Sequence, residues 1–178
     1  MIEPIEGVTK FQLDYRAAPA PAAADIATLN AWRSILWRLR LIGLNAQRYG
    51  GVGFGNVSCR YQNHFIVSGT QTGGIPVLSA RHYVCVEHAD TARNRVVARG
   101  PIAPSSESLT HAMVYALDPA VQYVFHVHSP EIWRRAAALG LPVTAREVAY
   151  GTPAMAAEMA RLYAAGPLRA QGIVVMLG

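Results

Sequence analysis

Apolar residues recur at three- and four-residue steps along several parts of the chain. The first run predicts an amphipathic helix that Asp25 caps and that ends near Gly43. Its apolar positions are Ile26, Leu29, Trp32, Leu36 and Leu39, and Arg33, Arg38 and Arg40 fall mostly between them. Further helices are expected over 104–117, where Pro, Ser and Glu precede apolar residues at helical spacing, over 130–139, which Gly140 closes, and over 153–164, where Pro153 suits the first turn.

Short runs rich in β-branched and aromatic residues separate these helices and predict strands. The expected strands are 57–61, 65–67, 82–87, 95–98, 121–128 and 172–177. Two glycine-rich segments, 49–56 and 68–74, are expected to be loops. Helices and strands are mixed without strict strand–helix–strand alternation. The pattern therefore favours an α/β fold in which helices cover a sheet that contains antiparallel pairs.

The length of 178 residues is that of one domain. We expect an extended N-terminal arm over 1–24, because 17–24 is a run of Pro and Ala, and one folded domain over 25–178. No apolar run reaches the roughly 18 residues that span a bilayer, and the first residues lack a signal-peptide layout. Cys59 and Cys85 cannot form a disulfide framework, so a cytoplasmic protein with no membrane partner is expected.

The chain carries 16 basic and 11 acidic residues, a net charge of +5, and almost all of the basic residues are arginine. These arginines are spread out and form no stripe interleaved with aromatic residues, so nucleic acid is not an expected partner. Because a guanidinium group suits phosphate and carboxylate, a small acidic substrate stays open.

His126 and His128 are two residues apart in an expected strand, where their side chains project to the same face. Two imidazoles in this arrangement suit one metal ion. The alternative is a pair of structural histidines that are hydrogen-bonded in a partly buried strand.

Ser105, Ser106 and Glu107 open an expected helix, where unpaired N–H groups and two hydroxyls suit a phosphate or carboxylate. Glu107 beside such an anion could act as a general acid or base, and plain helix capping is the alternative. His111, one turn later, is expected to pack or to orient Glu107.

The two glycine-rich loops could also bring N–H groups, an amide and hydroxyls to a phosphate. The relevant residues are Gly55, Asn56, Ser68, Gly69 and Thr70. Neither loop matches a phosphate-binding loop that ends in Gly-Lys-Ser/Thr or a dinucleotide fingerprint. Taken alone, each loop is an ordinary turn.

Four motifs in this order resemble the class II aldolase/adducin family. They are Gly55-Asn56-Val57-Ser58, Ser68-Gly69-Thr70, Pro104-Ser105-Ser106-Glu107 with His111, and His126-Val127-His128. The resemblance implies a three-layer α/β/α sandwich with a central, mainly antiparallel sheet, and a homotetramer with sites between subunits.

The resemblance also implies residue roles. Gly55, Asn56, Ser68, Gly69, Ser105 and Ser106 would bind a substrate phosphate, Glu107 would be the acid/base residue, and His126 and His128 would bind a divalent metal, usually Zn²⁺. The implied reaction is aldol cleavage of a small, phosphorylated sugar or hydroxycarbonyl compound through a metal-stabilised enediolate. An epimerase, dehydratase or decarboxylase on the same scaffold, or a non-catalytic adducin-like assembly module, is the alternative.

The family pattern has a third metal-ligating histidine after a late apolar strand. Here 172–177 resembles that strand, and the sequence ends at Gly178. His64, His82 and His88 do not match the position of the third ligand. We therefore expect the 25–178 domain to lack its C-terminal end.

Overall fold

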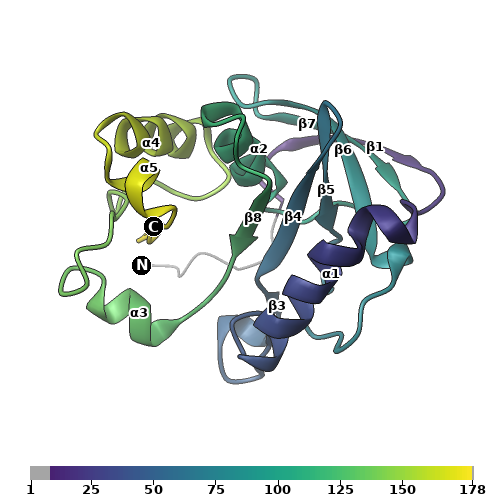
Figure 1. Cartoon of the computed structure of the whole chain (residues 1–178), viewed down its shortest axis with the longest axis horizontal. Helices are drawn as coiled ribbons and strands as arrows, with labels where there is room; N and C mark the ends of the chain where they lie inside the picture. The colour runs from purple at the N-terminus through teal and green to yellow at the C-terminus, as the bar shows by residue number, and fades with distance from the viewer. Residues whose placement is uncertain (1–8, 178) are drawn as a thin grey trace.

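The computed structural model describes residues 9–177, and a six-stranded sheet lies at its centre (Figure 1). The strand order is β1-β7-β6-β5-β4-β8. The strands are β1 (Gln12–Ala17), β4 (Asn56–Tyr61), β5 (His64–Ser68), β6 (Tyr83–Asp90), β7 (Arg95–Gly100) and β8 (Tyr123–His126). β1 joins β7 in parallel, whereas the other neighbours pair antiparallel. The sheet is therefore mixed: its neighbouring strands pair antiparallel everywhere except at the β1 edge.

The edge strand β1 lies inside the segment that was expected to be an extended arm. It pairs with β7 from Gln12 opposite Arg95 to Ala17 opposite Gly100. The Tyr15 hydroxyl donates a hydrogen bond to the Gly100 carbonyl at 2.6 Å. Part of the arm is therefore a strand of the sheet. Residues 1–8 of the predicted arm lie outside the described residues, and the domain boundary at 24/25 stays a prediction.

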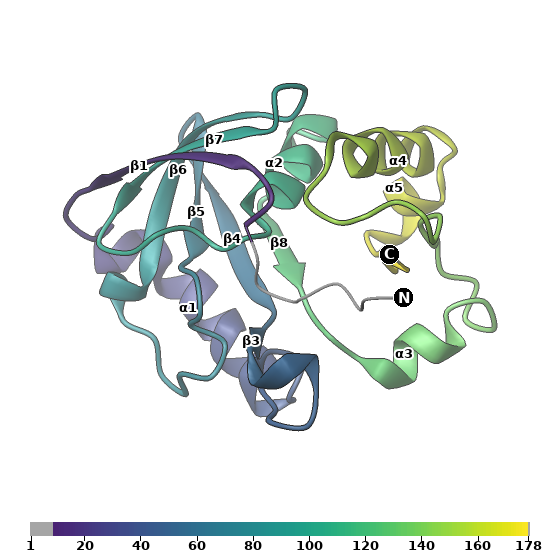
Figure 2. The ribbon, with the colours of Figure 1, turned by 180° about the vertical axis from the view of Figure 1, so that it is seen from behind.

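Five helices accompany the sheet within the described residues. They are α1 (Ala23–Arg38), α2 (Ser108–Leu117), α3 (Pro130–Arg135), α4 (Pro153–Ala164) and α5 (Pro167–Gln171). Two single 3₁₀ turns, η1 (Tyr49–Gly51) and η2 (Ala80–His82), and a small hairpin of β2 (Gly43–Leu44) with β3 (Gly53–Phe54) complete the set. Helix α1 lies in front of the sheet in Figure 1 and behind it when the molecule is turned round in Figure 2.

The two faces of the sheet carry separate apolar cores, because successive side chains of a strand point to opposite faces. On β5, Ile66 belongs to the core beneath α1, together with Ile26 and Leu29. Its neighbours Phe65 and Val67 belong to the core that α2 and α4 cover. Helices therefore pack on both faces of the sheet and hold its β4 and β8 strands in place.

Several expected elements have different bounds in the structure. Helix α1 begins before Asp25, which lies in its first turn and is not its cap. Helix α2 begins at Ser108, so 104–107 form the turn that precedes it. β8 ends at His126, so His128 lies beyond the strand. The expected strand at 172–177 is absent from the described residues, where Val175 makes a single bridge to Val143 after α5.

Other predictions are confirmed closely. Helix α4 covers 153–164 as expected, with Pro153 in its first turn and the Thr152 hydroxyl accepting a hydrogen bond from the Met155 N–H at 3.3 Å. The strands β4 and β5 form the expected hairpin. Within residues 9–177, no helix is both long and apolar enough to cross a membrane.

Candidate functional site

A small pocket lies where the two glycine-rich loops meet the turn before α2. Its lining comes from three stretches of chain that are far apart in the sequence. The lining residues are Gly53, Gly55, Asn56, Gly69, Thr70, Gln71, Thr72, Gly73, Ser105, Ser106 and Glu107. The lining is mostly polar backbone and small polar side chains, which suits a small polar ligand.

Two of the glycines allow backbone segments to approach each other closely at this pocket. Gly55 has φ +75°, and a Cβ there would lie 2.8 Å from Ile42 Cγ1 and 3.0 Å from the His126 carbonyl oxygen. A Cβ on Gly73 would lie 2.6 Å from the Gly43 carbonyl oxygen. Any larger residue at these positions would push the loops apart, so the glycines set the width of the pocket.

Asn56 and Ser68 were both expected to bind phosphate, but the structure places only Asn56 in the lining of the pocket. Asn56 lines the pocket, and its buried Oδ1 has no hydrogen-bond partner among residues 9–177. Ser68 is not in the lining: it is buried, and its hydroxyl oxygen accepts a hydrogen bond from the Val57 N–H at 3.2 Å. The structure thus gives Ser68 a role in holding β4 against β5.

The Ser105-Ser106-Glu107 turn forms one end of the pocket, and all three residues are buried. The Ser105 hydroxyl oxygen accepts from the Glu107 N–H at 3.3 Å, and the Ser105 carbonyl accepts from the Ser108 hydroxyl at 2.7 Å. These bonds fix the turn, so that Glu107 leads directly into α2. The side chain of Glu107 is only 3% exposed.

Glu107 and the two histidines converge at this end of the pocket. The Thr110 hydroxyl donates to Glu107 Oε2 at 2.8 Å, and His126 Nδ1 lies 3.9 Å from the same oxygen. The rings of His126 and His128 stack with centroids 4.9 Å apart and an interplanar angle of 26°. The expected side-by-side arrangement of the histidines is therefore present, although His128 lies past the end of β8.

Beneath the site, His111 belongs to a buried polar cluster. Its Nδ1 lies 2.6 Å from the Ser58 hydroxyl, which is also 2.8 Å from the Tyr115 hydroxyl. Burial, and to a lesser degree nearby His126, lowers the pKa of His111 to about 3, so its ring is neutral at pH 7. Its Nε2 has no hydrogen-bond partner in the described part of the chain. His111 is therefore a packing residue beneath the site.

The donor atoms of this site fit a divalent metal only in part. Imidazole nitrogens with a neighbouring carboxylate are donors that zinc accepts, and a catalytic zinc commonly has three protein ligands. Residues 9–177 bring together no group of three or more His, Cys, Asp and Glu side chains able to hold an ion. His126 and His128 are therefore two candidate donors, without a third in the described part of the chain.

Residues 42–172 match the family described as the class II aldolase and adducin N-terminal domain. The chain belongs to this family. A search of curated proteins finds no match to it. Since the class II aldolase/adducin family includes lyases, epimerases and non-catalytic members, membership does not by itself identify a reaction.

All of the pocket lining of this class II aldolase/adducin domain lies within the matched range, as do His126 and His128. The structure brings Gly55, Asn56, Gly69, Ser105, Ser106 and Glu107 to one pocket. The sequence did not single out Gln71, Thr72 and Gly73 as part of the site, because these residues match no motif. The density of Gly and Thr in this stretch, beside the expected Ser68-Gly69, was the available signal.

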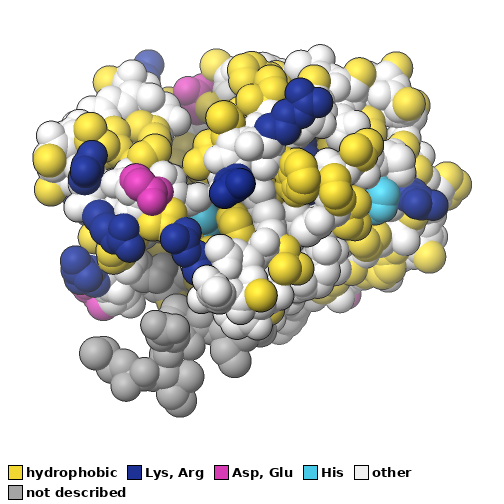
Figure 3. Space-filling model, turned by 90° about the horizontal axis from the view of Figure 1, so that it is seen from below, with side chains coloured by type: hydrophobic (Ala, Val, Ile, Leu, Met, Phe, Trp, Pro, Cys, Tyr) yellow, Lys and Arg dark blue, Asp and Glu magenta, His cyan; other side chains and the backbone are white. Residues whose placement is uncertain are grey.

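Basic side chains are visible on one face of the molecule. In the view of Figure 3, several Lys and Arg side chains lie toward the left, beside an acidic side chain, and others stand apart from them.

Proposed function

We propose that this domain is a metal-dependent carbon–carbon lyase of the class II aldolase type. Its substrate would be a small sugar or hydroxycarbonyl compound that carries a phosphate or similar oxyanion. The observation that carries the proposal is the position of the Glu107 carboxylate, 3.9 Å from His126, at one end of a pocket that also holds Asn56, Ser105 and Ser106.

The glycine-rich walls would bind the oxyanion of the substrate. Asn56, Ser105 and Ser106 offer an amide and two hydroxyls, and Gly55 and Gly69 let backbone approach closely. The turn before α2 lies at a helix N-terminus, whose N–H groups and dipole favour negative charge. These groups would hold one end of the substrate and leave the other end near Glu107.

His126 and His128 would bind a divalent metal, for which we propose Zn²⁺. When bound, the metal would supply Lewis-acid stabilisation of negative charge on substrate oxygens. The neutral, buried His111 cluster lies behind this position and would limit the movement of β8, which carries His126.

Glu107 would accept a proton from the substrate hydroxyl when the carbon–carbon bond breaks, and would return it in the reverse direction. The Thr110 hydroxyl donates a hydrogen bond to Glu107 Oε2 and so orients the carboxylate. Burial of Glu107 excludes bulk water from the proton transfer.

We further propose that the protein is cytoplasmic and forms a homotetramer, as the family resemblance implies. The molar mass of the purified protein, measured by light scattering during size-exclusion chromatography, tests the tetramer. A monomer mass would contradict it.

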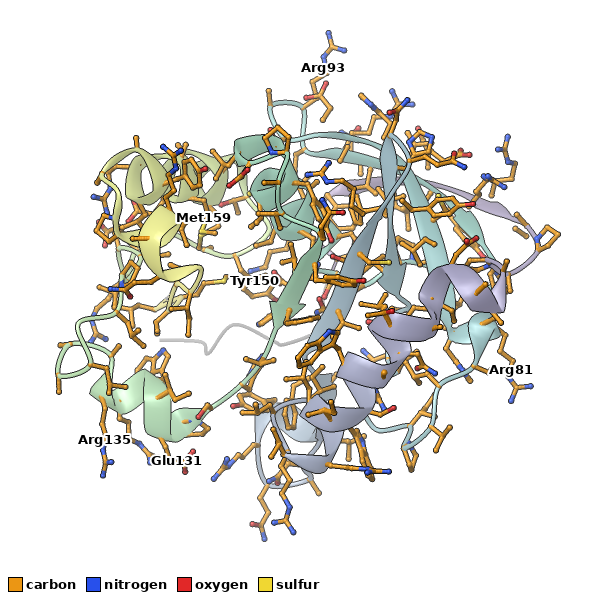
Figure 4. All side chains as sticks on the ribbon, viewed as in Figure 1. Arg81, Arg93, Glu131, Arg135, Tyr150 and Met159 are labelled. Carbon is orange, nitrogen blue, oxygen red and sulfur yellow. The ribbon has the colours of Figure 1, made fainter. Side chains whose placement is uncertain are left out.

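The experiment compares Glu107→Gln with Glu131→Gln and with the unmodified protein. Glu131 is an exposed glutamate in the first turn of α3 that points away from the body of the molecule, and it serves as the matched control (Figure 4). Each protein is supplied with zinc, manganese or cobalt and screened with phosphorylated and non-phosphorylated aldol substrates. Metal content is measured on the same samples.

We expect Glu107→Gln to keep its metal and to lose about 10²- to 10⁴-fold in kcat, because it removes a proton carrier and not a ligand. Glu131→Gln should match the unmodified protein. Full turnover in Glu107→Gln would show that the proton role is wrong. Absence of bound metal, with folding unchanged by a chelator, would favour a non-catalytic assembly module, and turnover without bond cleavage would favour an epimerase.

A further inference from the structure

Arg33 is a buried cation on α1 that the proposed chemistry does not use. Its side chain is 1% exposed, although its position in the helix pattern predicts a polar surface. Nη1 donates to the Pro76 carbonyl at 3.0 Å, and Nη2 donates to the carbonyls of Thr72 at 2.9 Å and Gly73 at 3.1 Å. Within residues 9–177 no carboxylate lies within ion-pair distance of this guanidinium.

A purely mechanical tie between α1 and this loop does not need a charge. Asn30, one turn earlier on the same helix, makes such a tie through a neutral amide, which donates to the Leu78 carbonyl at 3.1 Å. Burying a cation without a carboxylate is unfavourable, and burial accordingly lowers the pKa of Arg33, yet an arginine stays protonated at neutral pH. The choice of arginine therefore calls for a role in which the positive charge itself is useful.

The peptide geometry shows where that charge acts. The structure has no cis peptide bonds in its described part, and in a trans peptide the C=O and N–H point in opposite directions. Because the Thr72 and Gly73 carbonyls point to Arg33, the N–H groups of Gly73 and Gly74 point away from it. A Cβ built on Gly53 would lie 3.4 Å from Gly73 N and 3.5 Å from Gly74 N.

Gly53 and Gly73 both line the pocket, so these two nitrogens lie beside its glycine-rich wall. Neighbouring N–H groups that face one side form a concave site for an anion. A cation bound to the carbonyl side polarises the same peptides and increases the positive potential on their N–H side. Arg33 itself lies outside residues 42–172 and so is not part of the family match.

We infer that Arg33 is a positioning residue: it holds the Thr72–Gly74 peptides with their N–H groups toward the pocket and makes that wall attractive to the oxyanion of the substrate. The inference rests on the proposed function in assuming that the substrate carries an oxyanion. The Arg33 guanidinium, which lies behind the pocket and outside the sequence motifs, would set the selectivity for anionic over neutral ligands.

The test measures the affinity of the purified full chain for inorganic phosphate by calorimetric titration at low ionic strength. Arg33→Met keeps the length of the stem and removes the charge, whereas Arg33→Lys keeps the charge and removes the planar fork. Arg38→Met is the matched control, because Arg38 is an exposed arginine in the last turn of the same helix.

We expect Arg33→Met to weaken phosphate binding about tenfold or more, since a unit charge within several ångströms of an anion has an effect of this order. Arg33→Lys should stay within about threefold of the unmodified protein, and Arg38→Met within about twofold. Unchanged affinity in Arg33→Met overturns the inference. Equal losses in Arg33→Lys and Arg33→Met also overturn it, because a merely mechanical tie depends on the fork.

A second measurement uses the unmodified protein and can therefore be made even if Arg33→Met fails to fold. Phosphate added to ¹⁵N-labelled protein should move the amide proton resonances of Gly73 and Gly74 downfield. Phosphate binding without movement of these two resonances overturns the inference but leaves the proposed function intact. If the unmodified protein does not bind phosphate, the proposal that the substrate carries an oxyanion is wrong. The inference about Arg33 is then wrong as well.

Discussion

Gly55 lines the candidate pocket and lies against Ile42 and the backbone of His126. Its replacement by alanine tests how closely these segments pack. The φ of Gly55 is +75°, in the left-handed region that disfavours side chains. A Cβ would also lie 2.8 Å from Ile42 Cγ1, 3.0 Å from the His126 carbonyl oxygen and 3.2 Å from Ile42 Cα. Two of these three atoms belong to backbone, which cannot rotate away.

The magnitude follows from two separate contributions. The left-handed conformation costs an alanine about 1 kcal/mol. Overlap with backbone atoms that are held by the sheet adds about 1–3 kcal/mol, the range for overpacking a well-ordered interior. Gly140→Ala isolates the first contribution, because Gly140 has φ +62° and no atom lies within 4 Å of its Cβ position.

The assay is urea unfolding of both variants, followed by tryptophan fluorescence. Gly140→Ala should lower the free energy of unfolding by about 1 kcal/mol, and Gly55→Ala by about 2–4 kcal/mol, with unchanged m-values. The two substitutions share the same entropy change in the unfolded chain, so their difference reports the overlap at Gly55. Equal destabilisation of the two variants would refute the close approach of β8 to this loop.

Two further predictions concern stability. Ser58→Ala should lower the free energy of unfolding by about 1–3 kcal/mol in the same urea assay, because it leaves His111 and the Tyr115 hydroxyl without their shared partner; a loss below about 0.5 kcal/mol would contradict this. Hydrogen bonds from Arg161, and then from a backbone N–H, lower the pKa of Glu158 from 4.5 to about 2. The ionised Glu158 therefore stabilises the fold above pH 4.5, and this stabilisation is lost as the pH falls toward 2. In Glu158→Gln, the free energy of unfolding should decline less steeply between pH 4.5 and pH 2. A decline as steep as in the unmodified protein would contradict the lowered pKa of Glu158.

Local patterns predicted the elements whose sequence carries both a period and an end signal. Helix α4 was predicted over 153–164 because Pro153 suits the first turn of a helix, and the structure adds Thr152 as its N-cap. The hairpin of β4 and β5 was predicted because a polar turn separates two β-branched runs. In both cases the deciding interactions lie within a few residues of one another.

Elements that depend on distant partners were predicted less well. β1 alternates polar and apolar residues from Gln12 to Ala17, but it is mostly exposed and stands beside a Pro/Ala run, so its pairing with β7 was not expected. The apolar run 172–177 was predicted to be a strand, yet it makes one bridge to Val143 and no longer ladder in the described residues. Apolar composition indicates burial, but it does not supply the neighbouring strand that a ladder needs.

The same division holds for the candidate site. The sequence alone determined the residue types and their local spacing, including Ser105-Ser106-Glu107 and the His126, His128 pair, which were enough to indicate the family. Only the tertiary structure decided that Glu107 lies 3.9 Å from His126, because that distance depends on how β8 pairs with β4 and how α2 packs behind them. Burial of Arg33 against the Thr72–Gly73 carbonyls likewise comes from long-range packing that a local pattern does not encode.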